Sequence, residues 1–200
     1  LGKTECWFIL DCKENATLVV GHNAKTKEEL EQMIHEGRWK EFIREIPIKP
    51  GDFIQIDPGT VHAIKGGTLL LETQQSSDIT YRVYDYDRLS NGKPRQLHIV
   101  QSIDVITVPA KSADNSVVHI EKKDDAIQQL IQCPYYTVYR IDVEHRVETW
   151  QDKPFVLMSV VEGEGTLNGT PLKKGDHLIL PDGYGKVELQ GRMQIIASTI

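Results

Sequence analysis

The most constraining feature of this sequence is a repeat that relates its two halves. Residues 46–59 read Ile-Pro-Ile-Lys-Pro-Gly-Asp-Phe-Ile-Gln-Ile-Asp-Pro-Gly, and residues 170–183 read Thr-Pro-Leu-Lys-Lys-Gly-Asp-His-Leu-Ile-Leu-Pro-Asp-Gly. In both segments a strand, a Lys-x-Gly-Asp turn, an apolar strand and a Pro/Gly turn follow in the same order. The sequence therefore predicts two similar β-rich units. We place them at residues 1–110 and 115–200, with the boundary in the polar segment 108–115.

Short apolar runs between turn dipeptides predict strands along most of the chain, as in a β-sandwich or barrel. Residues 5–10 and 16–20 read as a hairpin, because a polar turn separates two runs rich in β-branched and aromatic residues. Between about residues 26 and 45 the apolar residues recur at helical spacing after a capping box, which predicts a short helical insert.

Composition excludes several classes of function. The chain has 200 residues, of which 40% are apolar and 26% charged, as in an ordinary globular protein. Its net charge of -6 provides no field for holding a polyphosphate backbone, so a nucleic acid is not an expected partner. Its apolar runs are far shorter than the roughly 20 residues of a membrane span, so no membrane association is expected. Three cysteines without CxxC spacing fit buried thiols in a reducing cytosol, which favours a cytoplasmic protein.

Two polar residues stand among the apolar strands of the first unit. His62 follows a Pro-Gly-Thr turn, and a lone strand histidine is either a hydrogen-bonded core residue or a metal ligand. Glu72 interrupts an apolar strand, where a charge is costly unless it is paired or bound to a metal. A strand register centred near Gly67 would set Glu72 opposite His62.

Two other groups of charged residues have two interpretations each. Lys3 and Glu5 are two positions apart, so in an extended strand their side chains point to the same side. They are either an exposed charge pair or part of a site. Asp78, Arg82 and Arg88 lie in a segment dense in charges and aromatic rings. They form either a solvated network or a fork for a phosphorylated substrate, since guanidinium groups make bidentate bonds to phosphate.

These motifs carry a resemblance to a known family. The strings at residues 49–53, 58–64 and 71–88 are similar to those of type I phosphomannose isomerases (mannose-6-phosphate isomerases) of the short bacterial form. The resemblance runs from residue 2 to the C-terminus, and the string 71–88 is specific to the family, whereas the Gly-Asp and Pro-x-Gly signature is shared by many cupins. It implies a mainly β fold of two tandem cupin-like (jelly-roll) barrels. The first barrel would be incomplete and carry the helical insert, and the second would be degenerate.

The resemblance also implies an activity. The family is zinc-dependent and interconverts mannose 6-phosphate and fructose 6-phosphate, an aldose-ketose isomerisation. Glu5 and His62 match two of its zinc ligands, and Lys3 matches an active-site cation. Glu72 matches an acidic residue, and the proton-transferring base would be either Glu72 or a zinc-bound water. The expected partner is a small sugar phosphate, and the expected assembly is a monomer or a weak homodimer.

The arginines of the string 71–88 complete the implied site. Arg82 matches an arginine considered for proton transfer or substrate polarisation, and Arg88 falls where the family has another basic residue. Asp78 is expected with Arg88 among the substrate-binding residues. In the second unit Lys186 takes the place of His62, so we interpret that unit as a packing barrel without a metal.

The sequence departs from the family at one motif. The other two zinc ligands, in a Gln-x-His-Pro segment, are expected upstream of Glu5, and that string occurs nowhere in the 200 residues. Catalytic zinc usually has three protein ligands, so this chain alone is expected to be an inactive fragment that binds zinc weakly or not at all. The alternative is a non-catalytic sugar- or sugar-phosphate-binding cupin without metal. A cupin oxygenase would need a further histidine or a facial triad in the same barrel, and the sequence shows neither.

Overall fold

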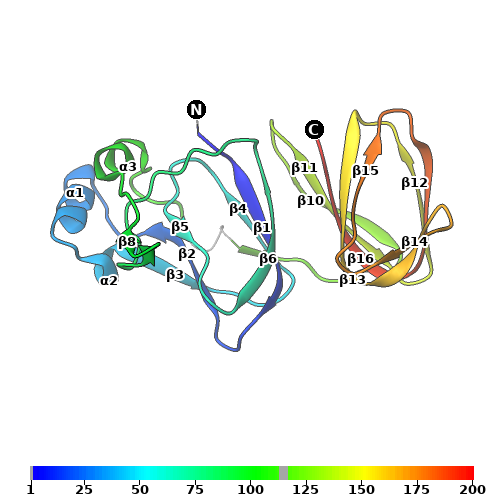
Figure 1. The fold of residues 1–200 in the computed structure, drawn as a ribbon, viewed down its shortest axis with the longest axis horizontal. Helices are drawn as coiled ribbons and strands as arrows, with labels where there is room; N and C mark the ends of the chain where they lie inside the picture. Colours follow the sequence, from blue (N-terminus) through cyan, green and yellow to red (C-terminus); the bar gives the residue numbers. More distant parts are fainter. Residues whose placement is uncertain (1, 113–116) are drawn as a thin grey trace. The chain divides into compact units, whose positions relative to one another are not determined.

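The computed structural model describes residues 2–112 and 117–200, which are mainly β-strand, as predicted (Figure 1). They divide into two compact units, and the boundary along the chain falls between Val118 and His119. The boundary predicted in segment 108–115 extends into residues 113–116, which lie outside the described residues. Among the residues described, no helix has the length and apolar character needed to cross a membrane.

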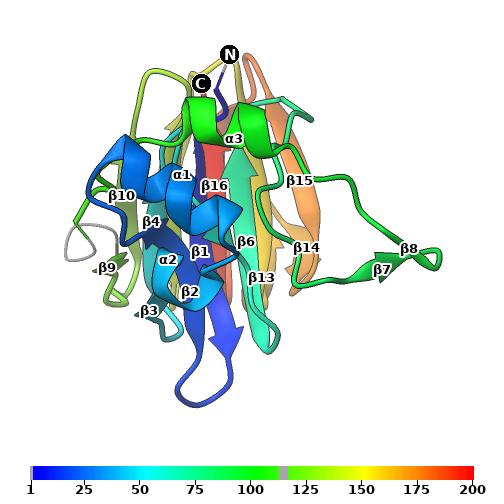
Figure 2. The same ribbon diagram turned by 90° about the vertical axis from the view of Figure 1, so that its left-hand side faces the viewer.

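Unit 1 contains all of the predicted site residues. Its elements are β1 (Glu5–Cys12), β2 (Thr17–His22), α1 (Lys27–His35), α2 (Trp39–Phe42), β3 (Ile43–Pro47), β4 (Asp52–Ile56), β5 (His62–Ala63), β6 (Thr68–Gln74), β7 (Leu89–Ser90), β8 (Lys93–Pro94), α3 (Ile99–Val105) and β9 (Val117–His119). The strands form one sheet of order β6-β1-β4-β9, a second of order β3-β2-β5, and the small β7-β8 hairpin. Figure 2 shows that this hairpin projects from the rest of the unit.

The hairpin predicted from residues 5–10 and 16–20 is wrong. β1 pairs with β4 and β6, whereas β2 pairs with β3 and β5, so the two strands belong to different sheets. Trp7 and Ile9 of β1 and Leu18 of β2 are buried in one core. Runs rich in β-branched and aromatic residues identified both strands, but such a strand can bury its apolar face against a facing sheet as well as beside a neighbour.

The helical insert is present and shorter than predicted. α1 begins at the capping box: the Thr26 hydroxyl accepts the Glu29 amide at 3.2 Å, and the Glu29 carboxylate accepts the Lys25 amide at 2.6 Å. Leu30 of α1 is buried among apolar residues of α2 and α3. The last residues of the predicted insert, from Ile43 on, belong to β3, because that strand pairs with β2.

Unit 2 is built around two long, bent strands. Its elements are β10 (Ala126–Gln132), β11 (Thr137–Val143), β12 (Arg146–Gln151), β13 (Phe155–Leu167), β14 (Thr170–Lys173), β15 (His177–Pro181) and β16 (Gly185–Thr199). The first half of β13 pairs with β15 and its second half with β14, while β16 pairs first with β12 and then with β11. Each of the two strands therefore pairs with different strands along its length, and together they enclose a core of apolar residues.

Glycines allow β13 and β16 to approach closely where they bend. Gly191 has a φ of +116°, and a Cβ on it would lie 2.6 Å from the Cα of Gly165. A Cβ on Gly163 would lie 2.0 Å from the carbonyl oxygen of Arg192. Any larger residue would push the two strands apart, which explains the Gly-x-Gly string of β13.

The sequence repeat corresponds to the same turn in both units. In unit 1 the Lys49 amide donates to the Asp52 carboxylate at 2.8 Å, and in unit 2 the Lys173 amide donates to Asp176, also at 2.8 Å. The glycine before each aspartate has a positive φ, +88° and +91° respectively. The Lys-x-Gly-Asp string therefore encodes this turn locally, through an aspartate that caps the backbone and a glycine in the left-handed region.

Candidate functional site

The predicted ligands Glu5 and His62 are in contact. Oε1 of Glu5 lies 3.1 Å from Nε2 of His62. Glu5 is the first residue of β1 and its side chain is 2% exposed, whereas His62 begins β5 and its side chain is 34% exposed. The two strands come from different sheets, so the tertiary fold brings together residues 57 positions apart (62 minus 5). The buried Glu5 carboxylate is thus paired with a partly exposed imidazole.

The backbone sets the orientation of the imidazole. Nδ1 of His62 lies 2.8 Å from the carbonyl oxygen of Thr60. A carbonyl only accepts, so Nδ1 carries the proton and Nε2 faces Glu5. Burial lowers the pKa of His62, but the hydrogen bond and the charge of Glu5 raise it by more, so the pKa lies above its usual value. This hydrogen bond to a backbone carbonyl is also how proteins fix the tautomer of a metal-binding histidine.

Lys3 completes a charged cluster with Glu5. Its Nζ lies 2.6 Å from Oε2 of Glu5 and donates to Oε1 of Gln74, also at 2.6 Å. Burial raises the pKa of Glu5, but its contacts with His62 and Lys3 outweigh this and lower the pKa below the usual value. Glu5 is therefore held as a carboxylate inside the protein.

Glu72 occupies a different place from the one predicted. β6 pairs with β1 and β5 pairs with β2, so the register that set Glu72 opposite His62 is wrong. Glu72 instead lies opposite Trp7, whose indole Nε1 donates to Oε2 of Glu72 at 2.9 Å. The Trp7 ring also meets the His62 ring edge-on, with 5.6 Å between centroids. The error arose because the turn around Gly67 connects different sheets rather than one antiparallel pair.

The arginines of the string 71–88 gather around a different carboxylate. The nearly buried Asp85 receives Arg88 Nη2 at 2.8 Å and Arg95 Nε at 2.7 Å, and Arg82 Nε lies 3.9 Å away. The hydrogen bond from Arg95, then that from Arg88, lowers the pKa of Asp85 well below its usual value against the opposing effect of burial. Asp78 is exposed on the same segment. The guanidinium groups of Arg82 and Arg88 thus contact Asp85, and that of Arg82 also the Gln96 carbonyl, so the roles of both arginines toward substrate stay predictions.

The described residues fit part of a metal site. Glu5 and His62 supply one carboxylate and one oriented imidazole, and Oε2 of Glu5 is buried without a hydrogen bond, with only the Lys3 ion pair. Across residues 2–112 and 117–200, however, no three His, Cys, Asp or Glu side chains gather as they would to hold a metal ion. Two donors fall short of the three protein ligands typical of catalytic zinc, so the residues present do not complete a site.

Sequence reasoning missed several members of this site. Gln74 follows Glu72 by two positions on β6, so the two-residue period of a strand could have placed it on the same face. The same period relates Trp7 to Glu5. Arg95 lies ten positions beyond Asp85, on the far side of the β7-β8 hairpin, and local sequence contains no signal for that contact.

Known proteins resemble the chain over nearly all of its length. Residues 126–200 match the family model of the mannose-6-phosphate isomerase cupin domain. Mannose-6-phosphate isomerase ManA of Bacillus subtilis is 49% identical over 203 residues, which cover 99% of this chain and 64% of the relative. Over its length, the chain is homologous to the mannose-6-phosphate isomerases. The mannose-6-phosphate isomerase of Streptococcus mutans is 45% identical, again over 99% of the chain and 64% of the relative.

Solved structures agree with this relationship. The crystal structure of the Bacillus subtilis mannose 6-phosphate isomerase matches with a TM-score of 0.88 at 45% identity, covering all of this chain and 65% of that one. A Salmonella typhimurium phosphomannose isomerase variant shares the fold with a TM-score of 0.79 at 14% identity. The predicted relationship to mannose-6-phosphate isomerases and the presence of a cupin domain are confirmed. The chain spans 64% of the length of the curated relatives described above.

Proposed function

We propose that this chain carries part of the active site of a zinc-dependent mannose-6-phosphate isomerase, which interconverts mannose 6-phosphate and fructose 6-phosphate. The observation that supports the proposal most directly is the contact of the buried Glu5 carboxylate with the accessible His62 imidazole, beside the Lys3 cation. The identity of 45–49% to named isomerases supports the reaction type.

The reaction moves a proton between C2 and C1 of the sugar through an enediol. A base takes the proton from C2 of the aldose and returns it to C1, so one carboxylate that faces the substrate can serve both steps. Glu72 suits this role, because its side chain is exposed while the Trp7 indole holds one of its oxygens. Lys3 would stabilise negative charge on the enediol oxygens, and Arg82 would orient the substrate.

Zinc belongs to the proposal with Glu5 and His62 as two of its ligands. The resemblance assigns the remaining donors to a Gln-x-His-Pro segment, a string that these 200 residues do not contain. Arg88 and Asp78 are proposed to contact the substrate, with the Arg88 guanidinium suited to its phosphate.

The fold proposed for the chain is a pair of cupin-like barrels, at about residues 1–110 and 115–200, in a cytoplasmic protein that is a monomer or a weak homodimer. The equivalent Lys-x-Gly-Asp turns of the two units support a common ancestry of the barrels. The match of residues 126–200 to the cupin domain supports the second barrel.

The full-length protein tests the proposal through its conversion of mannose 6-phosphate. We expect fructose 6-phosphate to form, a chelator to stop the reaction, and added zinc to restore it. Arg82→Ala should lower kcat about 100-fold while zinc content stays unchanged, since Arg82 is no metal ligand. Arg192→Ala is the matched control, because Arg192 is 79% exposed and lies in unit 2. Binding of mannose 6-phosphate without conversion would instead favour the non-catalytic sugar-phosphate-binding alternative.

A further inference from the structure

Trp7 is the largest fully buried side chain among the described residues, and it contacts two polar residues of the site. Its side chain points from β1 into the core of unit 1, on the same face as Glu5, and is 1% exposed. Its indole nitrogen reaches Glu72 on β6, and its ring reaches His62 on β5. The proposed base and one proposed metal ligand thus contact the same rigid side chain.

The two contacts of Trp7 have different chemistry. The Nε1–H donates to Oε2 of Glu72 at 2.9 Å, which is a hydrogen bond to a charged acceptor and therefore stronger than a neutral one. The contact with His62 is a T-shaped ring packing, at 5.6 Å between centroids and 69° between planes. The hydrogen bond fixes one oxygen of an otherwise exposed carboxylate, and the ring packing limits rotation of the imidazole.

The surroundings of Trp7 keep its ring in place. In the strand register it lies between Ile54 of β4 and Glu72 of β6, and it packs with Ile9 and Leu18 in the core. A Glu72 side chain without this bond would be free to change rotamer on the surface of β6. A buried donor at this position therefore restricts the carboxylate to one location relative to His62.

We propose that Trp7 is a positioning residue, which through its two contacts holds the Glu72 carboxylate at a fixed place relative to the His62 ring for proton transfer. This inference rests on the proposed function for its kinetic consequence, but the contact itself does not depend on it. An indole is suited to this task because its body fills the core while its single N–H serves a polar partner at the edge.

Kinetics of the full-length protein test the proposal. Trp7→Phe keeps an aromatic ring in the core and removes the N–H donor. We expect kcat for mannose 6-phosphate to fall about 10-fold to 100-fold while KM changes less than about twofold, because the bond orients a reacting group rather than binding substrate. Trp150→Phe is the matched control, since Trp150 is 67% exposed in unit 2, and it should leave kcat unchanged.

A double-mutant cycle separates positioning from a general loss of stability. In a Glu72→Ala background, Trp7→Phe should cause no further fall in kcat, because the group that it positions is gone. A Trp7→Phe protein with wild-type kcat overturns the proposal, and so does an equal fall in kcat with and without Glu72.

The indole proton of Trp7 gives a readout that does not require activity or a folded Trp7 variant. In the nuclear magnetic resonance spectrum, Glu72→Ala should shift the Nε1–H signal of Trp7 and leave those of Trp39 and Trp150 in place. If the protein forms no fructose 6-phosphate, the proposed function fails while this shift still upholds the contact. An unmoved Trp7 signal overturns the inference even if the isomerase is active.

Discussion

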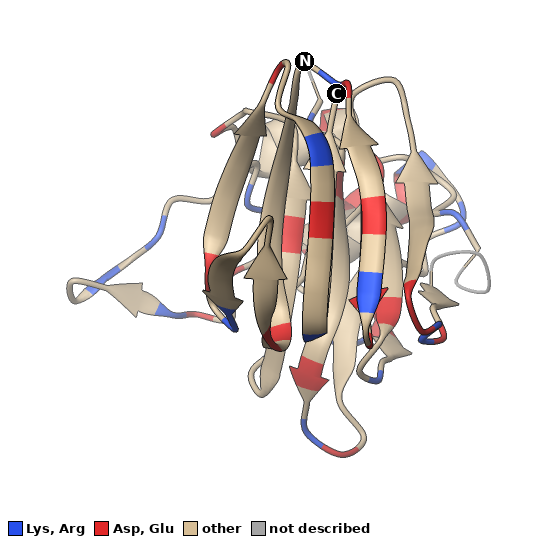
Figure 3. Cartoon of the chain, turned by 90° about the vertical axis from the view of Figure 1, so that its right-hand side faces the viewer, with Lys and Arg blue, Asp and Glu red and all other residues tan. Residues whose placement is uncertain are grey.

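The two Lys-x-Gly-Asp turns have the same structure but lead to strands of different character. In unit 1 the chain continues from Asp52 to His62, which meets a buried carboxylate. In unit 2 it continues from Asp176 to Lys186, which is 57% exposed and pairs with Glu148 at 2.8 Å on the surface. Figure 3 shows acidic and basic bands side by side on the strands of this unit. A repeated turn therefore preserves the fold without preserving a site.

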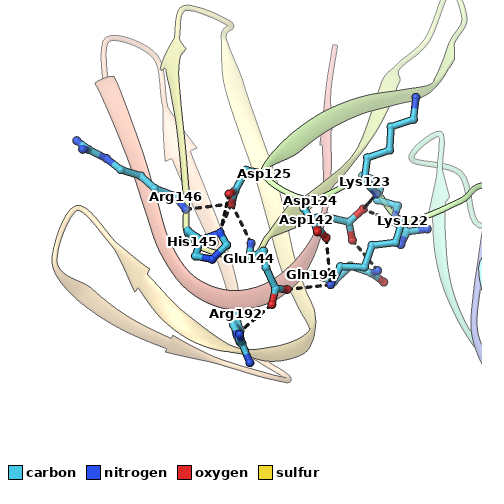
Figure 4. Close-up of polar contacts among 11 residues, drawn as sticks. Lys122, Lys123, Asp124, Asp125, Asp142, Glu144, His145, Arg146, Arg192 and Gln194 are labelled. Atoms are coloured by element: carbon cyan, nitrogen blue, oxygen red, sulfur yellow. Dashed lines mark hydrogen bonds and ion pairs between the residues drawn. The ribbon is translucent and has the colours of Figure 1, made fainter.

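Buried charges also differ between the units. In unit 2 Arg140 and Asp142 are both almost fully buried and pair at 2.8 Å, and Asp142 further accepts from Gln194 at 3.0 Å (Figure 4). In unit 1 the buried Glu5 pairs with a histidine that is 34% exposed. A pair enclosed on all sides serves structure, whereas a buried carboxylate joined to an accessible imidazole can meet a ligand.

The largest expected effect is on activity, and it should distinguish two variants at corresponding positions of the two units. His62→Ala should lower kcat for mannose 6-phosphate about 1000-fold and reduce zinc retention, because it removes a proposed metal ligand. Lys186→Ala, at the corresponding position of the repeat, should change neither beyond about twofold, since exposed ion pairs contribute little. Steady-state kinetics and metal analysis of both variants check this. Equal losses in the two variants would remove the functional contrast between the units.

A second pair of variants would sharpen the comparison of the turns themselves. Asp52 is 4% exposed, whereas Asp176 is only half-buried. Asp52→Ala should therefore lower the free energy of unfolding by about 1–3 kcal/mol, because it removes a buried carboxylate that accepts the Lys49 amide in a partly buried hydrogen bond. Asp176→Ala should cost less than about 1 kcal/mol, because water can replace the lost acceptor. Urea unfolding measures both, and a larger loss for Asp176→Ala would contradict the burial argument.

The smallest expected effect is a pH-dependent change in the stability of unit 2. Asp125 accepts the amides of His145, Glu144 and Arg146, all between 2.8 and 3.0 Å (Figure 4). The hydrogen bond from the His145 amide, followed by the others, lowers the pKa of Asp125 to about 2. Since the pKa is lowered on folding, the stabilisation is present above the ordinary Asp value of 3.8 and is lost as the pH falls toward about 2.

Asp125→Asn should accordingly be less stable than the wild type at pH 6 and nearly equal to it at about pH 2. Urea midpoints measured across this range check the prediction. Asp124→Asn is the control, because Asp124 is 68% exposed and its contact with Lys122 is a loose 3.7 Å. If the urea midpoints of Asp125→Asn and the wild type differ by the same amount at every pH, the charge on Asp125 does not stabilise the turn.

Local patterns predicted individual elements well. The capping box located α1, and the Lys-x-Gly-Asp repeat located the same turn twice. Strand pairing could not be predicted in this way: β1 and β2 are adjacent in sequence yet pair with different partners. The same limitation produced the wrong partner for Glu72, because the turn at Gly67 reads like a hairpin turn and its flanking strands enter separate sheets.

The sequence by itself determined the mainly β character, the repeat, the helical insert and the relationship to the isomerases, because turns, caps and motifs depend on residues close together in the chain. Only the tertiary structure decided that Glu5 meets His62, that Trp7 contacts both His62 and Glu72, and that Arg82 and Arg88 gather at Asp85. Those contacts depend on which sheet each strand joins, and that choice follows from burying apolar faces across the whole unit rather than from any local pattern.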